Sequence, residues 1–479
     1  MLEELSPKPV FHYFEELTKI PRCSGSEKQV SDYLVGFAHD HTLEVFQDEA
    51  LNVIIKKPET AGYEDSPAVI IQGHMDMVCE KTRASHHDFA KDALTLKVDG
   101  DIVRAEGTTL GADNGIAVAY ALALLDSDDI PHPPLEVLVT TSEETGMFGA
   151  AALDASNLAG KTLLNIDAEN EGVFFVSCAG GVDIVSEFDT AWETADDPAL
   201  LIEVSGLIGG HSGMEIVRQR GNAIKLLGRV LDAAREAGEF HVAAISGGSK
   251  SNAIAREASA TITADADVLA RVATIAGDVA AELKSEFGAA DPDIAITASP
   301  ADAPAEQLDL ASTDKLVSFL VIAPTGVQSM SQELEGLVES SLNLGVLAQS
   351  GKSIKLTVSV RSSVDSLMRE ITGRIEALAV LVGATTSRIG VYPAWRYEAE
   401  SPIRDLCVRV YKEVTGAEPE IQAIHAGLEC GLLKQKLPDT DMISFGPNLY
   451  NVHTTDEHLS INSVANTWKF LTAVLAKAK

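Results

Sequence analysis

The chain is poor in basic residues. It has 37 lysines and arginines against 71 aspartates and glutamates, a formal net charge of −34 over 479 residues. Such an excess of negative charge repels phosphate groups, which argues against nucleic acid and anionic membrane as partners. No apolar run approaches the roughly 18 residues that a membrane span needs, and the charged N-terminal segment lacks the apolar core of a signal peptide.

Cysteine is also scarce. The five cysteines are scattered along the sequence without a CxxC pair, at Cys23, Cys79, Cys178, Cys407 and Cys430. An odd and dispersed count in a long chain predicts reduced thiols in a cytoplasmic protein.

The length and the order of apolar segments predict two domains. A chain of 479 residues with 46% hydrophobic content exceeds one compact core. Up to about residue 180, strand-like runs such as PAVIIQ and PLEVLVTT alternate with helical ones, over 11–20, 27–37 and the stretch after Asn114. This alternation predicts an α/β catalytic domain with a mostly parallel sheet covered by helices.

After Gly180 the pattern changes to β-α-β-β-α, followed by two further strands and a helix. The loose stretch ASPADAPAEQLDLAS between these parts is typical of a connection. We therefore expect an inserted α+β lid domain over residues 186–400. The catalytic domain would consist of residues 1–185 and 401–479.

Five short motifs carry acids or histidines where strands or buried segments end. The motifs are IQGHMDMV, TTLGADNGIAVA, VTTSEETG, LLNIDAE and NVHTTDEH, with the candidate ligands His74, Asp113, Glu144, Asp167 and His453. Parallel sheets collect ligands at the carboxyl ends of their strands. Two imidazoles and three carboxylates suit a pair of divalent ions, zinc first, with cobalt or manganese as substitutes. The set predicts a hydrolase.

Each motif has an ordinary structural alternative. Asp76 of HxD can accept the second ring N–H of His74 and fix its orientation, or the pair is a buried histidine with a capping aspartate. Asp113 lies between Gly111 and Gly115 before a helix, where it can bridge two metals or act as an N-cap. Taken singly, the structural alternatives are the more common.

The residues of the remaining motifs also have either a functional or a structural interpretation. Of the adjacent acids Glu143 and Glu144, one can bind metal while the other faces the substrate as general base, and an exposed acidic turn is the alternative. His458 competes with His453 as the last ligand. We prefer His453 because the acidic TDE that follows it offers partners for the imidazole.

Together these motifs resemble the co-catalytic zinc peptidases that include carboxypeptidase G, succinyl-diaminopimelate desuccinylase and aminoacylase. GADNGIAVA, GGHSGMEI, SNAIAR and HAGLECG resemble the aminoacyl-histidine dipeptidase branch, or cytosol non-specific dipeptidases, over nearly the whole chain. The resemblance implies that Asp113 bridges two zincs. His74 and Asp167 would bind one, and Glu144 and His453 the other. It also implies Glu143 as general base, Asp76 as the residue that orients His74, and a non-prolyl cis peptide after Asp113.

The lid motifs supply further candidates by the same resemblance. His211 in GGHSG would stabilise the oxyanion, unless it is a structural turn histidine. The arginines would bind the substrate's peptide oxygen or carboxylate, or else form surface salt bridges. The candidate substrate-binding residues are Asn252, Arg256, Arg361, His425 and Glu429.

The sequence thus predicts a metal-dependent dipeptidase that hydrolyses Xaa-His and other dipeptides with water activated by two zincs and Glu143 as base. A related N-acyl-amino-acid deacylase or tripeptidase with the same metal core is the alternative enzyme, and a catalytically inactive metal-binding scaffold is the alternative without catalysis. The expected partner is a small peptide, and the resemblance is compatible with a homodimer formed through the lid.

Overall fold

The computed structural model describes residue 2 and residues 4–479, which divide into two compact units. The first comprises Met1–Ser177, Tyr397–Ala423 and Leu428–Lys479, and the second Cys178–Arg396 with Ile424–Gly427. The border expected at residue 185 falls inside strand β9 (Gly180–Phe188), which belongs wholly to the second unit. The sequence pattern also gave no sign of the short segment 424–427.

The first unit is built on a mixed eight-stranded sheet with the order β1-β2-β6-β3-β7-β23-β8-β22. The four central strands, β6, β3, β7 and β23, run parallel to one another. The flanking strands pair antiparallel: β1 with β2, β2 with β6, and β8 with β23. The strands are β1 (Glu44–Gln47), β2 (Val53–Lys57), β3 (Val69–His74), β6 (Leu135–Thr140), β7 (Thr162–Asn165), β8 (Val173–Cys178), β22 (Glu420–Ile424) and β23 (Asp441–Ser444).

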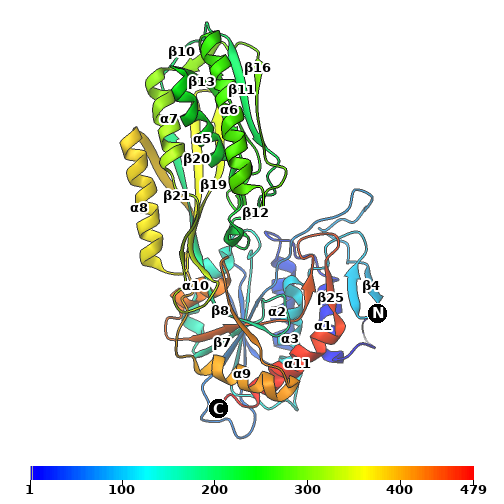
Figure 1. The fold of residues 1–479 in the computed structure, drawn as a ribbon. Coiled ribbons are helices and arrows are strands. Elements are labelled where there is room, and N and C mark those ends of the chain that lie inside the picture. The colour runs from blue at the N-terminus through cyan, green and yellow to red at the C-terminus, as the bar shows by residue number, and fades with distance from the viewer. Residues whose placement is uncertain (1, 3) are drawn as a thin grey trace. The chain divides into compact units, whose positions relative to one another are not determined.

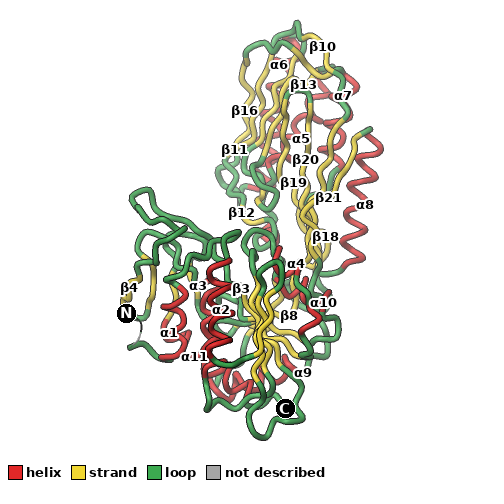
Figure 2. Tube along the Cα trace, turned by 180° about the vertical axis from the view of Figure 1, so that it is seen from behind, coloured by secondary structure: helices red, strands yellow, loops and turns green. Residues whose placement is uncertain are grey.

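Helices cover this sheet (Figures 1 and 2). They are α1 (Lys8–Leu17), α2 (Lys28–Asp40), α3 (Ala112–Asp126), α4 (Phe148–Ala152), α9 (Pro402–Thr415), α10 (Glu429–Lys436) and α11 (Ile461–Leu475). In α1 the regularly spaced Phe11, Phe14 and Leu17 are buried as predicted, whereas Ile20 lies beyond the helix end. Val69 and Ile71 of β3 join the same core cluster, so this helical face is held by burial of apolar surface.

Helix α3 is buried on nearly every side, which explains why its sequence IAVAYALALL carries no polar stripe. A small four-stranded sheet, ordered β24-β25-β5-β4, joins the C-terminal part of the chain to an early segment. Its strands are β4 (Leu96–Asp99), β5 (Ile102–Ala105), β24 (Leu449–Tyr450) and β25 (His458–Ser460). The loop between β24 and β25 contains His453, so this pairing fixes where that loop begins and ends.

The second unit contains a nine-stranded sheet with the order β16-β11-β15-β13-β19-β20-β9-β21, and β18 pairs with β19. Besides β9, its strands are β11 (Ala199–Ser205), β13 (His241–Gly247), β15 (Ala258–Thr263), β16 (Ala295–Ala301), β18 (Gly326–Met330), β19 (Val338–Ser350), β20 (Ser353–Ser362) and β21 (Ala384–Tyr392). Helices α5 (Ala223–Ala234), α6 (Ala266–Phe287), α7 (Leu310–Ile322) and α8 (Asp365–Val382) pack against it (Figure 2).

Short strands complete the second unit: β10 (Trp192–Thr194) pairs with β17 (Glu306–Leu308), and β12 (Gly210–His211) with β14 (Ala253–Ile254). The prediction that ASPADAPAEQLDLAS is a connection was wrong. Residues 298–301 extend β16 along β11, and 306–308 form β17, because cross-strand pairing overrides the weak strand preference of Ala, Pro and Glu. The fold class is as expected, an α/β unit with helices on its sheet, interrupted by an α+β unit.

The cysteine prediction is corrected by the structure. Cys23 and Cys79 form a disulfide with their Cα atoms 5.7 Å apart, and the other three cysteines are buried. The two segments meet through a bridge between Cys23 and Met77, a tertiary contact that the 56-residue separation did not reveal. None of the helices that the structure describes is long and apolar enough to cross a membrane.

Candidate metal centre and active site

The carboxyl ends of three adjacent parallel strands bring the candidate ligands together. His74 is the last residue of β3, Asp167 follows β7 by two residues, and Glu144 follows β6 by four. Asp113 lies in the first turn of α3, and His453 lies in the loop between β24 and β25. All five residues belong to the first unit.

The Asp113 carboxylate lies between the two histidines. Its Oδ1 is 3.2 Å from His74 Nε2, and its Oδ2 is 3.1 Å from His453 Nε2. Asp167 Oδ1 lies 3.6 Å from the same His74 nitrogen, and Glu144 Oε2 lies 2.9 Å from His453 Nε2. Three groups of ligand atoms form, each within 4.8 Å, and two of them share Asp113: one with His74 and Asp167, the other with Glu144 and His453.

The charges around these groups call for cations. The carboxylates of Asp113 and Glu144 raise the pKa of His453 to about 11. Burial would lower the pKa of His74, but its contacts with Asp113 and Asp76 raise it well above the usual value. Burial likewise opposes the effect of both histidines on Asp113, yet they hold its pKa well below the usual range. The surrounding carboxylates thus favour positive charge at both imidazoles, and divalent ions bound here would meet the same demand.

The donor set fits such ions. Neutral imidazoles and carboxylates are ligands of zinc and of similar divalent metals. Glu144 Oε1 is buried and accepts no hydrogen bond from the residues that the structure describes. A buried carboxylate oxygen of this kind is costly unless a cation or a donor compensates it.

Glu143 lies outside the two groups that share Asp113 and forms the third group with His74 and Glu144. Its Oε2 is 3.9 Å from His74 Nε2. Burial and the nearby carboxylates of Glu429, Glu144 and Asp113 raise its pKa to about 8, although His74 opposes them. A carboxylate with a pKa near neutrality can both accept and return a proton.

Asp76 is completely buried and supports both the histidine and the glutamates. Its Oδ1 lies 3.2 Å from His74 Nδ1 and accepts the backbone N–H of Glu143. Its Oδ2 accepts the backbone N–H of Glu144 and the hydroxyl of Ser24. The sequence predicted the contact with His74, but it did not predict the hydrogen bonds to the backbone of Glu143 and Glu144.

Asn114 ties the first turn of α3 to the ends of the neighbouring strands β3 and β7. Its Oδ1 accepts the backbone N–H of His74, and its Nδ2 donates to the carbonyl of Ile166. The Asp113–Asn114 peptide bond is cis, as the family resemblance implied. Asp113 and Asn114 depart from helical dihedral angles within α3.

Glu429 is fully buried under the cluster. Its Oε2 accepts hydrogen bonds from Gln72 Nε2 at 2.6 Å and Thr140 Oγ1 at 2.7 Å. Burial raises its pKa to about 7. Its Oε1 is buried and accepts no hydrogen bond from the residues that the structure describes, so one carboxylate oxygen remains for a further donor.

Two candidate histidines lie in the second unit. His211 Nδ1 accepts the backbone N–H groups of Gly213 and Met214, so the neutral ring carries its proton on Nε2. Burial and the charge of Arg361 lower the pKa of His211, which favours that neutral form. His425 Nε2 lies 2.8 Å from the hydroxyl of Ser341.

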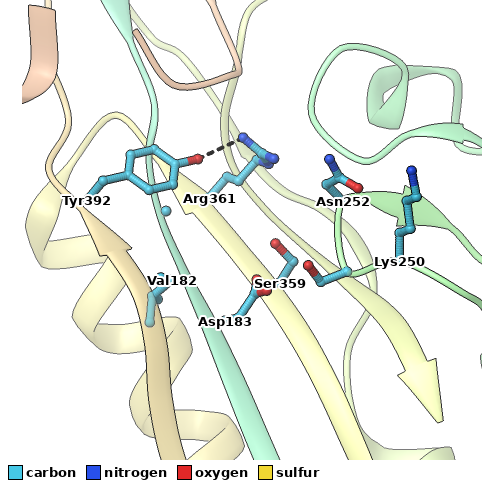
Figure 3. Close-up of a pocket in the computed structure, with 10 residues that line it drawn as sticks. Val182, Asp183, Lys250, Asn252, Ser359, Arg361 and Tyr392 are labelled. Carbon is cyan, nitrogen blue, oxygen red and sulfur yellow. Dashed lines mark hydrogen bonds between the residues drawn. The ribbon is translucent and has the colours of Figure 1, made fainter. Parts of the chain in front are cut away.

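The second unit also holds a pocket of about 420 Å³ that includes Asn252 and Arg361 (Figure 3). Arg361 is 8% exposed and donates from Nη1 to the hydroxyl of Tyr392 at 2.8 Å. Lys250 lines the same pocket, and so does one acid, Asp183. Arg256 is exposed and lines a separate hollow along the sheet, so it does not share the pocket of Arg361.

Comparison with known proteins shows the family of this chain. The model of peptidase family M20/M25/M40 matches residues 70–477. The chain belongs to this family. It is therefore an enzyme that hydrolyses peptide bonds, and the ligand motifs His74 to His453 all fall inside the matched region.

Two relatives of this M20 peptidase cover nearly its full length. It is 38% identical to the cytosol non-specific dipeptidase of Escherichia coli (strain K12) over 476 residues, 99% of this chain and 98% of the relative. The crystal structure of aminoacylhistidine dipeptidase from Vibrio alginolyticus matches with 38% identity and a TM-score of 0.93, covering 100% of this chain and 98% of that one. An aminopeptidase of Bacillus cereus, 14% identical over 99% of each chain with a TM-score of 0.58, shares the fold.

Sequence reasoning missed several supports of the M20 centre. Arg22 is fully buried and donates to the carbonyls of Met75, Asp76 and Gly111. Glu27 Oε1 accepts the N–H and hydroxyl of Ser142, just before the two glutamates. Arg22, Ser24 and Glu27 all lie in the segment PRCSGSE. Its two charged residues could have indicated this role, but charged residues in a turn with glycine and serine are usually exposed.

The acidic TDE after His453 was expected to provide partners for that imidazole. Its Glu457 instead accepts backbone N–H groups from Leu110 to Asp113. His458 lies on β25 with its ring stacked on Tyr450, away from the ligand groups.

Proposed function

We propose that this chain is a metal-dependent dipeptidase that cleaves Xaa-His and other dipeptides. The observation that carries the proposal is the position of Asp113, whose two oxygens face two different histidines. The names of the two full-length relatives, a non-specific and an aminoacyl-histidine dipeptidase, support the substrate class.

The two metal positions follow from the shared carboxylate. Asp113, His74 and Asp167 would hold one ion, and Asp113, Glu144 and His453 the other. Zinc is the ion we propose, with cobalt or manganese able to replace it. When bound, such a pair lowers the pKa of a water and polarises the scissile carbonyl.

Glu143 is the proposed general base. Its carboxylate takes a proton from the attacking water as the oxygen–carbon bond forms, and returns that proton to the leaving nitrogen as the carbon–nitrogen bond breaks. Burial among neighbouring carboxylates raises its pKa from the usual value toward the range where one group can accept and return a proton. Asp76 holds the backbone of Glu143 and the ring of His74, so it would orient base and ligand together.

Residues of the second unit would bind the substrate. His211 carries its proton on Nε2, the nitrogen that can donate to a developing oxyanion. Arg361 and Asn252 offer donors for the terminal carboxylate, and Lys250 adds a positive charge to their pocket. Arg256, His425 and Glu429 remain candidates for substrate contacts, and Glu429 also supports the sheet through Gln72 and Thr140.

We also propose a cytoplasmic location, since the E. coli relative is named a cytosol enzyme. The Cys23–Cys79 disulfide weighs in the other direction, because such bonds persist mainly in oxidising compartments. Fractionation of cells that express the protein, with thiol trapping at lysis, tests both points. Recovery of the oxidised protein only outside the cytoplasm would contradict the location.

The test of the reaction is Glu143→Gln. This isosteric change removes the base and leaves the metal ligands intact, so kcat for alanyl-histidine should fall by about 10²–10⁴-fold while two metals per chain remain. Glu49→Gln, an exposed position in the same unit, is the matched control. Turnover of the Glu143→Gln variant within threefold of the parent would sink the base assignment.

Substrate class is tested in parallel with N-acetyl-amino acids and tripeptides on the parent protein. A kcat/KM for either that exceeds the value for dipeptides would favour the deacylase or tripeptidase. Metal binding without turnover of any of these substrates would favour the inactive scaffold.

A further inference from the structure

The Glu457 carboxylate accepts hydrogen bonds from four consecutive backbone N–H groups that end at Asp113. Its Oε2 accepts the N–H groups of Leu110 and Gly111 at 2.7 and 3.0 Å. Its Oε1 accepts those of Ala112 and Asp113 at 2.8 and 3.3 Å. Four consecutive amides thus converge on one carboxylate that is 3% exposed.

The backbone can present these N–H groups together because Gly111 adopts a left-handed conformation with φ of 66°. Such a turn points successive N–H groups toward a common centre and forms an anion-binding concavity. A Cβ at this position would lie 2.5 Å from Arg22 Nη2 and 2.7 Å from Met77 Sδ. The loop therefore has room only for glycine and depends on an acceptor for its amides.

Arg22 holds the opposite side of the same loop. Its Nη2 donates to the Gly111 carbonyl, and its Nη1 donates to the carbonyls of Met75 and Asp76 beside His74. A buried cation on the carbonyl side and a buried anion on the amide side fix the loop between them. These charge-assisted hydrogen bonds are stronger than neutral ones.

Glu457 also belongs to the turn that carries His453. Its own N–H donates to the Thr454 carbonyl, which closes that turn. At one end of the turn, His453 Nε2 lies 3.1 Å from Asp113 Oδ2. At the other end, Glu457 accepts a hydrogen bond from the backbone N–H of Asp113. One short segment thus contacts the loop twice, once at the carboxylate and once at the peptide groups.

We propose that Glu457 is a positioning residue that sets the distance between His453 and Asp113, and so assembles the second metal position. This inference rests on the proposed metal centre. Glu457 touches no ligand atom and would act only through the loop and the turn. Loss of such an outer contact typically weakens metal affinity or activity by about 10–100-fold.

The experiment is a stepwise zinc titration against a chelator, made on the parent chain, Glu457→Gln and Glu457→Asp. Asp456→Asn, the exposed neighbouring acid, is the matched control. We expect both Glu457 variants to lose about 10–100-fold in at least one binding step, while the control stays within about threefold. The Glu457→Asp variant keeps the charge and withdraws the carboxylate by one methylene. Parent-like affinity of that variant would mean that charge alone matters and would overturn the positioning role.

A double-mutant cycle with His453→Gln tests the coupling. If Glu457 acts through the placement of His453 and Asp113, the two losses of metal affinity are non-additive. Additive losses would contradict the proposal. A parent chain that binds no zinc would instead remove the proposed function, so the two failures are distinguishable.

Hydrogen exchange on the metal-free parent protein provides a readout that needs no variant to fold. The amides of Leu110 to Asp113 should exchange as slowly as those of the core of α3, because Glu457 occupies them without metal. Exchange of these four amides as fast as that of an exposed loop would overturn the inference.

Discussion

Replacing Arg22 tests how the metal-binding loops are supported. The side chain is 2% exposed, and its guanidinium donates to the carbonyls of Met75, Asp76 and Gly111. Arg22→Met keeps much of the volume and removes all three hydrogen bonds. The loss leaves buried carbonyls unpaired and removes a buried cation. Burial lowers the pKa of Arg22 to about 10, although the charges of Glu457, Asp76, Asp113 and Glu144 oppose this shift.

The magnitude follows from two opposing effects. Hydrogen bonds that involve a charged group contribute about 1.5–3 kcal/mol each, but removal of a buried charge regains part of its desolvation cost. Removing one partner of a buried charged arrangement costs roughly 3–5 kcal/mol. For a domain of about 150–250 residues, each kcal/mol shifts Tm by about 2–4 °C, so we expect a drop of roughly 6–20 °C.

The assay is thermal unfolding of the metal-free protein followed by circular dichroism, with urea unfolding as a second measure. Arg83→Met, at an exposed position, is the control and should change stability by less than about 0.5 kcal/mol. A Tm for the Arg22→Met variant within about 3 °C of the control would refute the reasoning, because three charge-assisted bonds would then contribute nothing.

Three further predictions follow from the site. Asp76→Asn should weaken zinc binding by about 10–100-fold in a chelator competition, and parent-like affinity would argue against its role in orienting His74. Gly73→Ala places a Cβ 2.5 Å from Asn114 Oδ1 and 2.7 Å from Ala117 Cβ. The free energy of unfolding, measured in urea, should therefore fall by about 1–3 kcal/mol, and an unchanged urea midpoint would contradict this steric argument. Zinc affinity should rise from about pH 6 to pH 9, because the free protein holds a proton on His453, with its pKa raised to about 11, and the metal must displace it. A flat affinity profile over that range would contradict the assignment of His453 as a ligand.

Much of the fold could be predicted because the local pattern and the tertiary environment agree. The strand Val69–His74, which begins with three β-branched residues, is central and buried on both faces, as its composition suggests. The repeated apolar positions of α1 and the apolar character of α3 also match their burial. The strand ends then brought His74, Glu144 and Asp167 together, because neighbouring parallel strands end at one edge of a sheet.

The parts that could not be predicted depend on contacts between distant segments. Arg22 has the sequence context of a surface charge in a turn, and only the folded chain shows that three carbonyls surround it. Glu457 follows a candidate ligand, yet its partners lie more than 340 residues earlier. The disulfide of Cys23 with Cys79 has the same origin, since its spacing matches no recognised pairing pattern. The type of a residue indicated its chemistry, but finding its partners required the fold.

The most direct test of the account is release of free histidine from alanyl-histidine and β-alanyl-histidine. It would compare the purified protein, the chelated protein, and chelated protein given back two equivalents of zinc. The account predicts that activity disappears on chelation and returns with the second equivalent, since Asp113 is shared by both ligand groups. Full activity of the chelated protein, or no cleavage of either peptide by the fully zinc-loaded protein, would contradict a two-metal dipeptidase.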